Sequence, residues 1–189
     1  MSKIKMITIW IYLPLFFLIA GGDYCYGNNE VEDVFINQMG KEVRLSDFKN
    51  KVVLMTFSYT SCPETGCYLL GMQLLRAQLR FKNRIGKDLF LLNVSIDPEK
   101  DTPEVLMKSA EKYKVVDHKG WFFLTGNTEA IDRLRKKYGV EWETGPDGNR
   151  YHEVAIVLLN QKGETEKVYD SYIKGKKKII EDIKTLLNS

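Results

Sequence analysis

Apolar residues along the chain form short continuous runs that alternate with segments of helical periodicity. Residues 51–59 and 89–96 are dense in β-branched, aromatic and aliphatic side chains, which is typical of strands buried on both faces. Between them, apolar residues recur at helical spacing over residues 67–83, and Gly86 follows. The linking segment, residues 60–66, contains Pro and Gly and predicts a turn.

The remaining elements continue this alternation. Residues 34–36 and 42–45 flank a Gly-bearing turn and predict a β-hairpin, after which Ser46 and Asp47 suit the cap of a single helical turn. Thr102 as N-cap and Pro103 at the first helical position predict a helix to about Tyr113. Further strands are predicted at residues 121–124, 154–159 and 166–169, and further helices at 127–138 and 179–187.

This order predicts an α/β fold with a mixed sheet flanked by helices and an N-terminal β-hairpin. The sheet is mixed because the last two strands form a hairpin around residues 161–163. A cysteine-bearing loop follows the first central strand, and the next helix is expected to begin at the second cysteine. That arrangement is thioredoxin-like.

Composition and charge narrow the class of protein. The chain has 189 residues, of which 44% are hydrophobic and 28% charged, the profile of one folded globular domain. Its net charge is +3, and acidic and basic residues alternate along it. We therefore expect no nucleic-acid partner, since a phosphate backbone is bound by clustered positive charge.

The N-terminal residues predict export. Lys3 and Lys5 precede an apolar stretch over residues 6–22. Residues 1–27 are interpreted as a signal peptide, cleaved after Gly22 or Gly27, or as an uncleaved N-terminal membrane anchor. The domain proper is then 28–189, and it is expected in an oxidising extracytoplasmic compartment, the periplasm, either soluble or anchored to the inner membrane.

Two of the three cysteines carry the candidate chemistry. Cys25 lies at the edge of the export segment, and the residues before it fit the lipoprotein pattern poorly. Cys62 and Cys67 are five positions apart, too close to stabilise a domain by closing a loop. A cysteine at a helix N-terminus has a lowered pKa, which favours Cys67 as a thiolate.

Such a pair can cycle between dithiol and disulfide, bind a soft metal, or form an inert disulfide. On a regular helix, positions five apart point about 140° away from each other. The loop between Cys62 and Cys67 must therefore be irregular for their sulfurs to meet.

Two histidines are present. His152 precedes the predicted strand at 154–159 and can face the same edge of the sheet as the cysteine loop, whereas His118 lies in a polar turn and is interpreted as solvated. Two Cys and one His make a soft donor set suited to Cu(I), and with another donor to Cu(II). A solvated surface side chain is the alternative for His152.

The chain resembles the Sco/SenC family, thioredoxin-fold proteins that handle copper during cytochrome c oxidase assembly. The resemblance covers about residue 34 to the end. His152 lies eleven residues before Gly163, as the family's metal-binding His does before the Gly of its last hairpin. The other matching segments are residues 45–54, the cysteine loop Phe57-Ser58-Tyr59-Thr60-Ser61-Cys62-Pro63, the run Ser95-Ile96-Asp97-Pro98-Glu99-Lys100-Asp101-Thr102-Pro103, and Trp121 with Leu124-Thr125-Gly126.

The resemblance implies copper, as Cu(I) or Cu(II), bound by Cys62, Cys67 and His152. It also implies that Asp97 is a nearby acidic residue, which either supports the ligands or starts the following helix, with the structural role preferred. The chain departs from the family pattern in the cysteine loop, where four residues rather than three separate the cysteines and Tyr68 follows the second.

Three functions are compatible with the sequence. The preferred one is a copper-binding metallochaperone, rather than an enzyme, whose acceptor is the copper-bearing subunit of cytochrome c oxidase or another extracytoplasmic cuproprotein. The second is an extracytoplasmic thiol–disulfide oxidoreductase that uses Cys62 and Cys67 as its redox-active pair. The third is a domain with a structural disulfide that docks to a partner. Because a disulfide cannot hold copper, a thiol–disulfide reductant is also expected as a partner.

Overall fold

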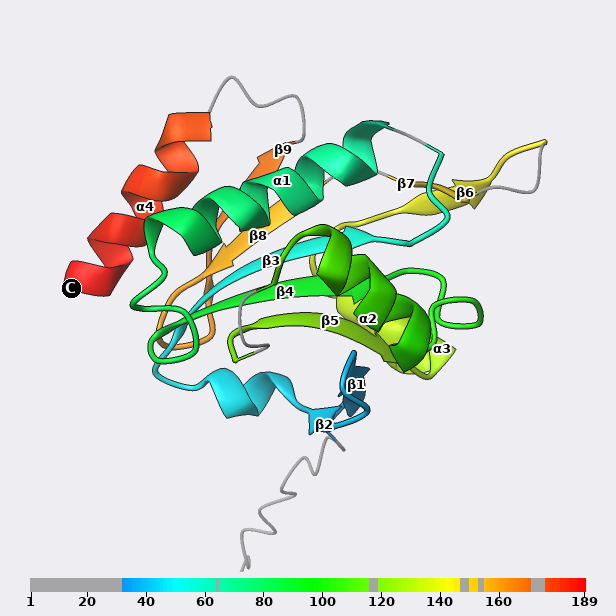
Figure 1. Cartoon of the computed structure of the whole chain (residues 1–189), viewed down its shortest axis with the longest axis horizontal. Coiled ribbons are helices and arrows are strands. Elements are labelled where there is room, and N and C mark those ends of the chain that lie inside the picture. The colour runs from blue at the N-terminus through cyan, green and yellow to red at the C-terminus, as the bar shows by residue number, and fades with distance from the viewer. Residues whose placement is uncertain (1–31, 64, 116–118, 147–149, 153–154, 171–175) are drawn as a thin grey trace, which may run out of the picture. The chain divides into compact units, whose positions relative to one another are not determined.

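A mixed sheet of seven strands organises the chain (Figure 1). The computed structural model describes residues 32–63, 65–115, 119–146, 150–152, 155–170 and 176–189, and Glu32–Ser189 forms one unit by its internal contacts. The predicted export segment lies outside the described residues, as does His118. None of the helices in the described ranges is both long and apolar enough to cross a bilayer.

The elements follow the predicted alternation of strands and helices. The strands of the sheet are β1 (Phe35–Asn37), β2 (Glu42–Val43), β3 (Val52–Ser58), β4 (Leu89–Ser95), β5 (Trp121–Gly126), β8 (Ala155–Leu159) and β9 (Thr165–Asp170). The helices are the 3-10 turn η1 (Leu45–Phe48), α1 (Thr65–Arg80), α2 (Pro103–Lys112), α3 (Thr128–Lys137) and α4 (Lys176–Asn188).

The strand order β2-β1-β5-β4-β3-β8-β9 confirms the predicted mixed sheet. β3, β4 and β5 are parallel, whereas β8 is antiparallel to β3 and β9 to β8. Since parallel strands end at one edge, the cysteine loop after β3 and the segment 96–102 after β4 leave the sheet together. This edge carries the candidate site.

Alternate residues of the central strands face two separate cores. Val53, Met55 and Phe57 pack with residues of α3, and Val52 and Leu54 pack on the opposite face against α1, α2 and α4. All seven residues of β3 are buried, as the continuous apolar run predicts. Helices on both faces therefore hold β3, and with it the start of the cysteine loop, in a fixed position.

Several local predictions are confirmed in detail. Phe35 and Ile36 pair with Val43 and Glu42, which forms the N-terminal hairpin. The Thr102 side chain accepts a hydrogen bond from the Val105 backbone and caps α2, a contact that contributes about 1 kcal/mol to helix stability. Asn127, predicted as the first residue of a helix, instead caps α3, since its side chain accepts a hydrogen bond from the Ala130 backbone.

Other features differ from the predictions. α1 begins at Thr65, two residues before Cys67, because Thr and Gly are well tolerated at a helix start, and it ends at Arg80 rather than Asn83. The turn η1 is capped by Arg44, whose backbone N–H donates to the Asp47 carboxylate, rather than by Ser46 or Asp47 as cap. An additional hairpin of β6 (Trp142–Thr144) and β7 (Arg150–His152) precedes β8.

Candidate functional site

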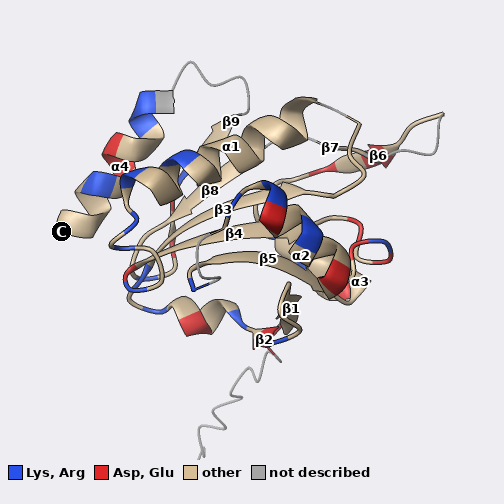
Figure 2. Cartoon of the chain, in the orientation of Figure 1, with Lys and Arg blue, Asp and Glu red and all other residues tan. Residues whose placement is uncertain are grey.

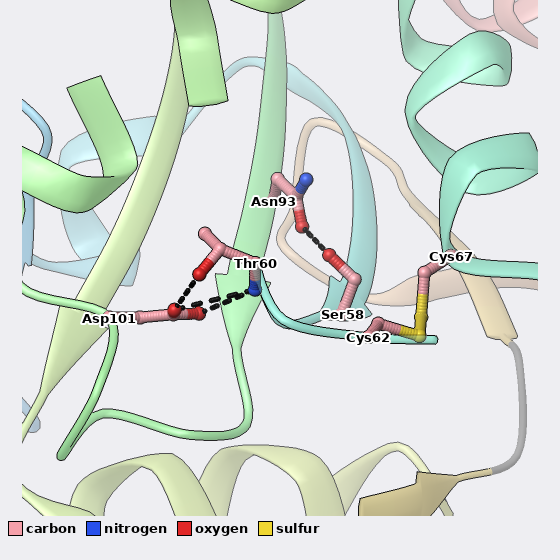
Figure 3. Close-up of a disulfide and its surroundings, with 6 residues drawn as sticks. All are labelled: Ser58, Thr60, Cys62, Cys67, Asn93 and Asp101. Carbon is pink, nitrogen blue, oxygen red and sulfur yellow. Dashed lines mark hydrogen bonds between the residues drawn. A yellow bond between two sulfur atoms is a disulfide. The ribbon is translucent and has the colours of Figure 1, made fainter. Parts of the chain in front are cut away.

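Cys62 and Cys67 are joined by a disulfide at the start of α1 (Figure 3). Their Cα atoms are 6.4 Å apart, although the cysteines are five positions apart in the sequence. The loop is therefore irregular in the way that contact between the sulfurs requires. Cys67 occupies the first turn of α1, where free backbone N–H groups and the helix dipole favour a thiolate after reduction.

The two sulfurs differ in access. Cys67 is buried, with 8% of its surface exposed, whereas Cys62 is half-buried and packs against the core cluster that contains Phe57 and Tyr138. Cys62 is thus the more exposed of the two cysteines, whereas Cys67 lies at the N-terminus of α1.

Asp101 holds the beginning of the cysteine loop. Its carboxylate accepts hydrogen bonds from the Thr60 backbone N–H, at 3.1 and 3.3 Å to its two oxygens, and from the Thr60 hydroxyl (Figure 3). The Ser95 hydroxyl donates to Asp101 Oδ2 at 2.6 Å. We refer to Asp101, Thr60 and Ser95 as the Asp101 network. It joins the end of β4 and the start of α2 to the residue two positions before Cys62.

Sequence reasoning singled out Asp97 and missed Asp101 as a site residue. Both carboxylates are fully buried, with 1% and 0% of their surface exposed. Asp97 forms an ion pair with Lys100 at 3.4 Å, and its backbone carbonyl accepts from the Lys100 and Asp101 N–H groups, as expected for a residue that shapes the turn before α2. The sequence run contains both acids, but only the fold determines which one meets the cysteine loop.

A cleft of about 230 Å³ opens beside the disulfide, between α1 and α2. Its polar lining includes Asn93, whose Oδ1 accepts from the Ser58 hydroxyl at 2.7 Å (Figure 3). The other lining residues are Tyr59, Thr60, Cys62, Cys67, Tyr68, Ser95, Asp101, Leu106, Ser109, Lys112, Tyr113 and Phe123. The cleft is smaller than the roughly 300–1,000 Å³ of pockets that enclose drug-sized ligands, so it suits a single side chain or a small molecule.

Tyr113 closes the inner wall of this cleft by packing on the backbone of α1. A Cβ atom at Gly71 would lie 2.2 Å from the Tyr113 ring, so that only glycine permits this approach. The ring also stacks against Tyr68, with 6.4 Å between their centroids, and Tyr68 is 57% exposed beside the disulfide. An exposed aromatic side chain at this position is available to a docking partner.

Burial perturbs two titratable groups in the cleft. Desolvation raises the pKa of Asp101 above its ordinary value, although the hydrogen bonds from Ser95 and Thr60 act in the opposite direction. Burial also raises the pKa of Tyr113, with a smaller contribution from Tyr68. Both shifts follow from the exclusion of water at the inner end of the cleft.

The first half of α1 carries no charged side chain (Figure 2), and among the described residues the charged groups that line the cleft beside the disulfide are Asp101 and Lys112. Between Ser58 and Leu75 the described residues carry no Lys, Arg, Asp or Glu, and basic and acidic residues alternate over the other helices. Within this segment the helix terminus is therefore the group that favours a thiolate, and Lys112 is the basic side chain that lines the cleft.

The backbone of His152 lies in β7, where it pairs with Trp142 of β6. Trp142 packs against the same core cluster as Cys62. The strand that follows, β8, pairs Ile156 with Thr56 near the end of β3, so its first residues lie at the edge where β3 enters the cysteine loop. The side chain of His152 lies outside the described residues, and within the described part of the chain no three Cys, His, Asp or Glu residues converge as a metal site.

A family model described as SCO1/SenC matches residues 30–188. The SCO1 protein homolog of Bacillus subtilis is 31% identical over 176 residues, which cover 90% of this chain and 89% of that protein.

Two solved structures are also similar. BsSco, described as a member of the Sco family of cytochrome c oxidase assembly proteins in a study of its disulfide switch, is 29% identical with a TM-score of 0.66, over 82% of this chain and 91% of that one. Arabidopsis thaliana ScoI, solved with copper bound, shares the fold at 22% identity and a TM-score of 0.66, over 82% and 97% of the two chains. The family model and the Bacillus subtilis relative show that the chain belongs to the SCO1/SenC family.

Proposed function

We propose that the protein is a copper-binding metallochaperone that acts in maturation of the copper site of cytochrome c oxidase. The observation that carries this proposal is the contact between Cys62 and Cys67 at the sheet edge, in a family whose relatives include a protein solved with copper bound. When the disulfide is reduced, two sulfur donors become available at one point of the surface.

The donor set fits copper chemically. Two thiolates and one imidazole are soft ligands that match Cu(I), and a further donor from a partner or from solvent would suit Cu(II). We assign His152 as the third ligand. This assignment is supported by the backbone position of His152 opposite Trp142, which packs on the same core as Cys62.

Redox state would control loading with copper. Reduction of the Cys62–Cys67 disulfide takes two electrons and two protons and yields two thiols, which lose their protons when they bind the metal. In the oxidised pair neither sulfur is a thiolate that could bind the metal. A thiol–disulfide reductant is therefore a required partner, and the acceptor is the copper-bearing subunit of cytochrome c oxidase or another extracytoplasmic cuproprotein.

The proposed compartment is the periplasm. It is supported by the disulfide, which persists in oxidising compartments, and by the basic and apolar pattern of the first residues. Residues 6–22 would serve as an export signal or as an anchor in the inner membrane.

A second candidate function, thiol–disulfide exchange with a partner protein, is favoured by one observation. The half-buried Cys62 lies beside a cleft that is large enough for a side chain of the partner. In this reaction a partner thiolate attacks one sulfur of the disulfide and the other sulfur leaves as a thiolate, after which the partner's second thiolate resolves the mixed disulfide.

A copper titration in two redox states tests the primary proposal. The chain would carry Cys25→Ser, so that only Cys62 and Cys67 respond to oxidation. We expect the reduced form to bind one Cu(I) per chain, and the oxidised form to bind it at least about 100-fold more weakly because it lacks both thiolates. Binding that is equal in the two forms would refute the assignment, and binding in neither form would favour thiol exchange.

A further inference from the structure

The Asp101 network connects two segments that are 41 residues apart in the sequence. The Asp101 carboxylate receives three donor groups: the Thr60 N–H, the Thr60 hydroxyl and the Ser95 hydroxyl. The Asp101 backbone is itself held, because its N–H donates to the Asp97 carbonyl at 2.9 Å. Because both its backbone and its side chain are hydrogen-bonded, the buried Asp101 restricts the positions of the groups that donate to its carboxylate.

Thr60 in turn restricts the position of Cys62. It lies two residues before Cys62, in a turn closed by the hydrogen bond from the Cys62 N–H to the Tyr59 carbonyl at 3.3 Å. Cys62 lies three residues before the first residue of α1, so it is outside the helix that carries Cys67. The position of Cys62 therefore depends on the turn on its N-terminal side and on its packing against the core cluster that contains Phe57.

We propose that Asp101 is the positioning residue of the cysteine pair: through Thr60 it holds Cys62 close to Cys67 and so favours closure of the disulfide. Two thiols held near each other form a disulfide at higher effective concentration than two thiols on a mobile loop. Asp101 acts through the loop and makes no bond to sulfur itself. The inference concerns the dithiol–disulfide equilibrium and is independent of copper.

The test is a redox equilibrium of the full chain in a Cys25→Ser background with dithiothreitol as the reference dithiol. In this reaction dithiothreitol closes to its cyclic disulfide, and its two electrons and two protons reduce the Cys62–Cys67 disulfide to two thiols. We expect Asp101→Asn to reduce the equilibrium constant for disulfide formation about tenfold, because an amide cannot accept all three donors. Tenfold corresponds to about 30 mV in the reduction potential of this two-electron couple.

The matched control is Asp97→Asn. Asp97 is equally buried in the same segment, but its carboxylate pairs with Lys100. We expect this variant to keep the parent redox equilibrium even if it lowers the unfolding midpoint. A purely structural role for Asp101 would alter the unfolding midpoint of both variants and leave the redox equilibrium of both unchanged.

Variants of Thr60 keep the inference testable if Asp101→Asn fails to fold. Thr60→Val removes the hydroxyl donor and retains the N–H, so a smaller shift, about threefold in the same direction, is expected. Thr60→Ser restores the hydroxyl and should restore the parent equilibrium. An unchanged equilibrium in Asp101→Asn or Thr60→Val, or an equal shift in Asp97→Asn, would overturn the proposal.

Discussion

Replacing both loop cysteines by serine is expected to abolish tight copper binding by the reduced chain. Serine has nearly the shape of cysteine, but its hydroxyl is a hard donor that remains protonated near neutral pH and is a poor ligand for Cu(I). We expect Cys62→Ser/Cys67→Ser to lower the affinity for Cu(I) by on the order of 1,000-fold or more. Competition with a chromogenic Cu(I) chelator measures this change.

Cys25→Ser is the control for this variant. It removes a thiol of the predicted leader and leaves the pair at α1 intact. Unchanged affinity in the control, together with loss in the double variant, would locate the copper at the cysteine loop. Retention of tight binding by the double variant would mean that the loop cysteines are not the ligands.

His152→Ala is expected to separate copper binding from thiol chemistry. Loss of one of three ligands should weaken Cu(I) binding by on the order of 100-fold, whereas a dithiol requires no imidazole to exchange with a small thiol. The two activities are measured on the same preparation, by chelator competition and by the rate of disulfide reduction with glutathione. Selective loss of copper affinity is the predicted result.

The second histidine supplies a matched control. His118→Ala changes the same residue type in the segment interpreted as a solvated turn, and it should leave both activities unchanged. If His152→Ala lowered copper affinity and thiol exchange to the same extent, His152 would have a structural role. If neither activity changed, the third ligand would have to be sought elsewhere.

An element could be predicted from the sequence where its hydrophobic pattern extends over many residues or where its capping residue is evident. The apolar runs of β3 and β4 and the cap at Thr102 determine their elements locally, and these predictions are confirmed. The β6–β7 hairpin was missed because each strand has three residues, too few to show an alternation of polar and apolar positions. The turn that contains Gly and Pro, between aromatic residues, is the sequence feature that could have indicated this hairpin.

The site could be predicted only in part. Cys62 and Cys67 were identified from residue type and from their place after a buried strand, and the disulfide confirms that they meet. The role of Asp101 could not be predicted, because it depends on the parallel pairing of β3 with β4, which brings Ser58 beside Ser95 and the two following loops together. Local sequence contains no information on which of the two nearby carboxylates accepts hydrogen bonds from Thr60.

The ligand set Cys62, Cys67 and His152 is the central claim, and the X-ray absorption spectrum of the reduced, Cu(I)-loaded chain tests it most directly. Two sulfur scatterers and one imidazole nitrogen per copper are expected, with the imidazole signal lost in His152→Ala and retained in His118→Ala. A spectrum without sulfur scatterers, or one whose imidazole signal survives in His152→Ala, would contradict it.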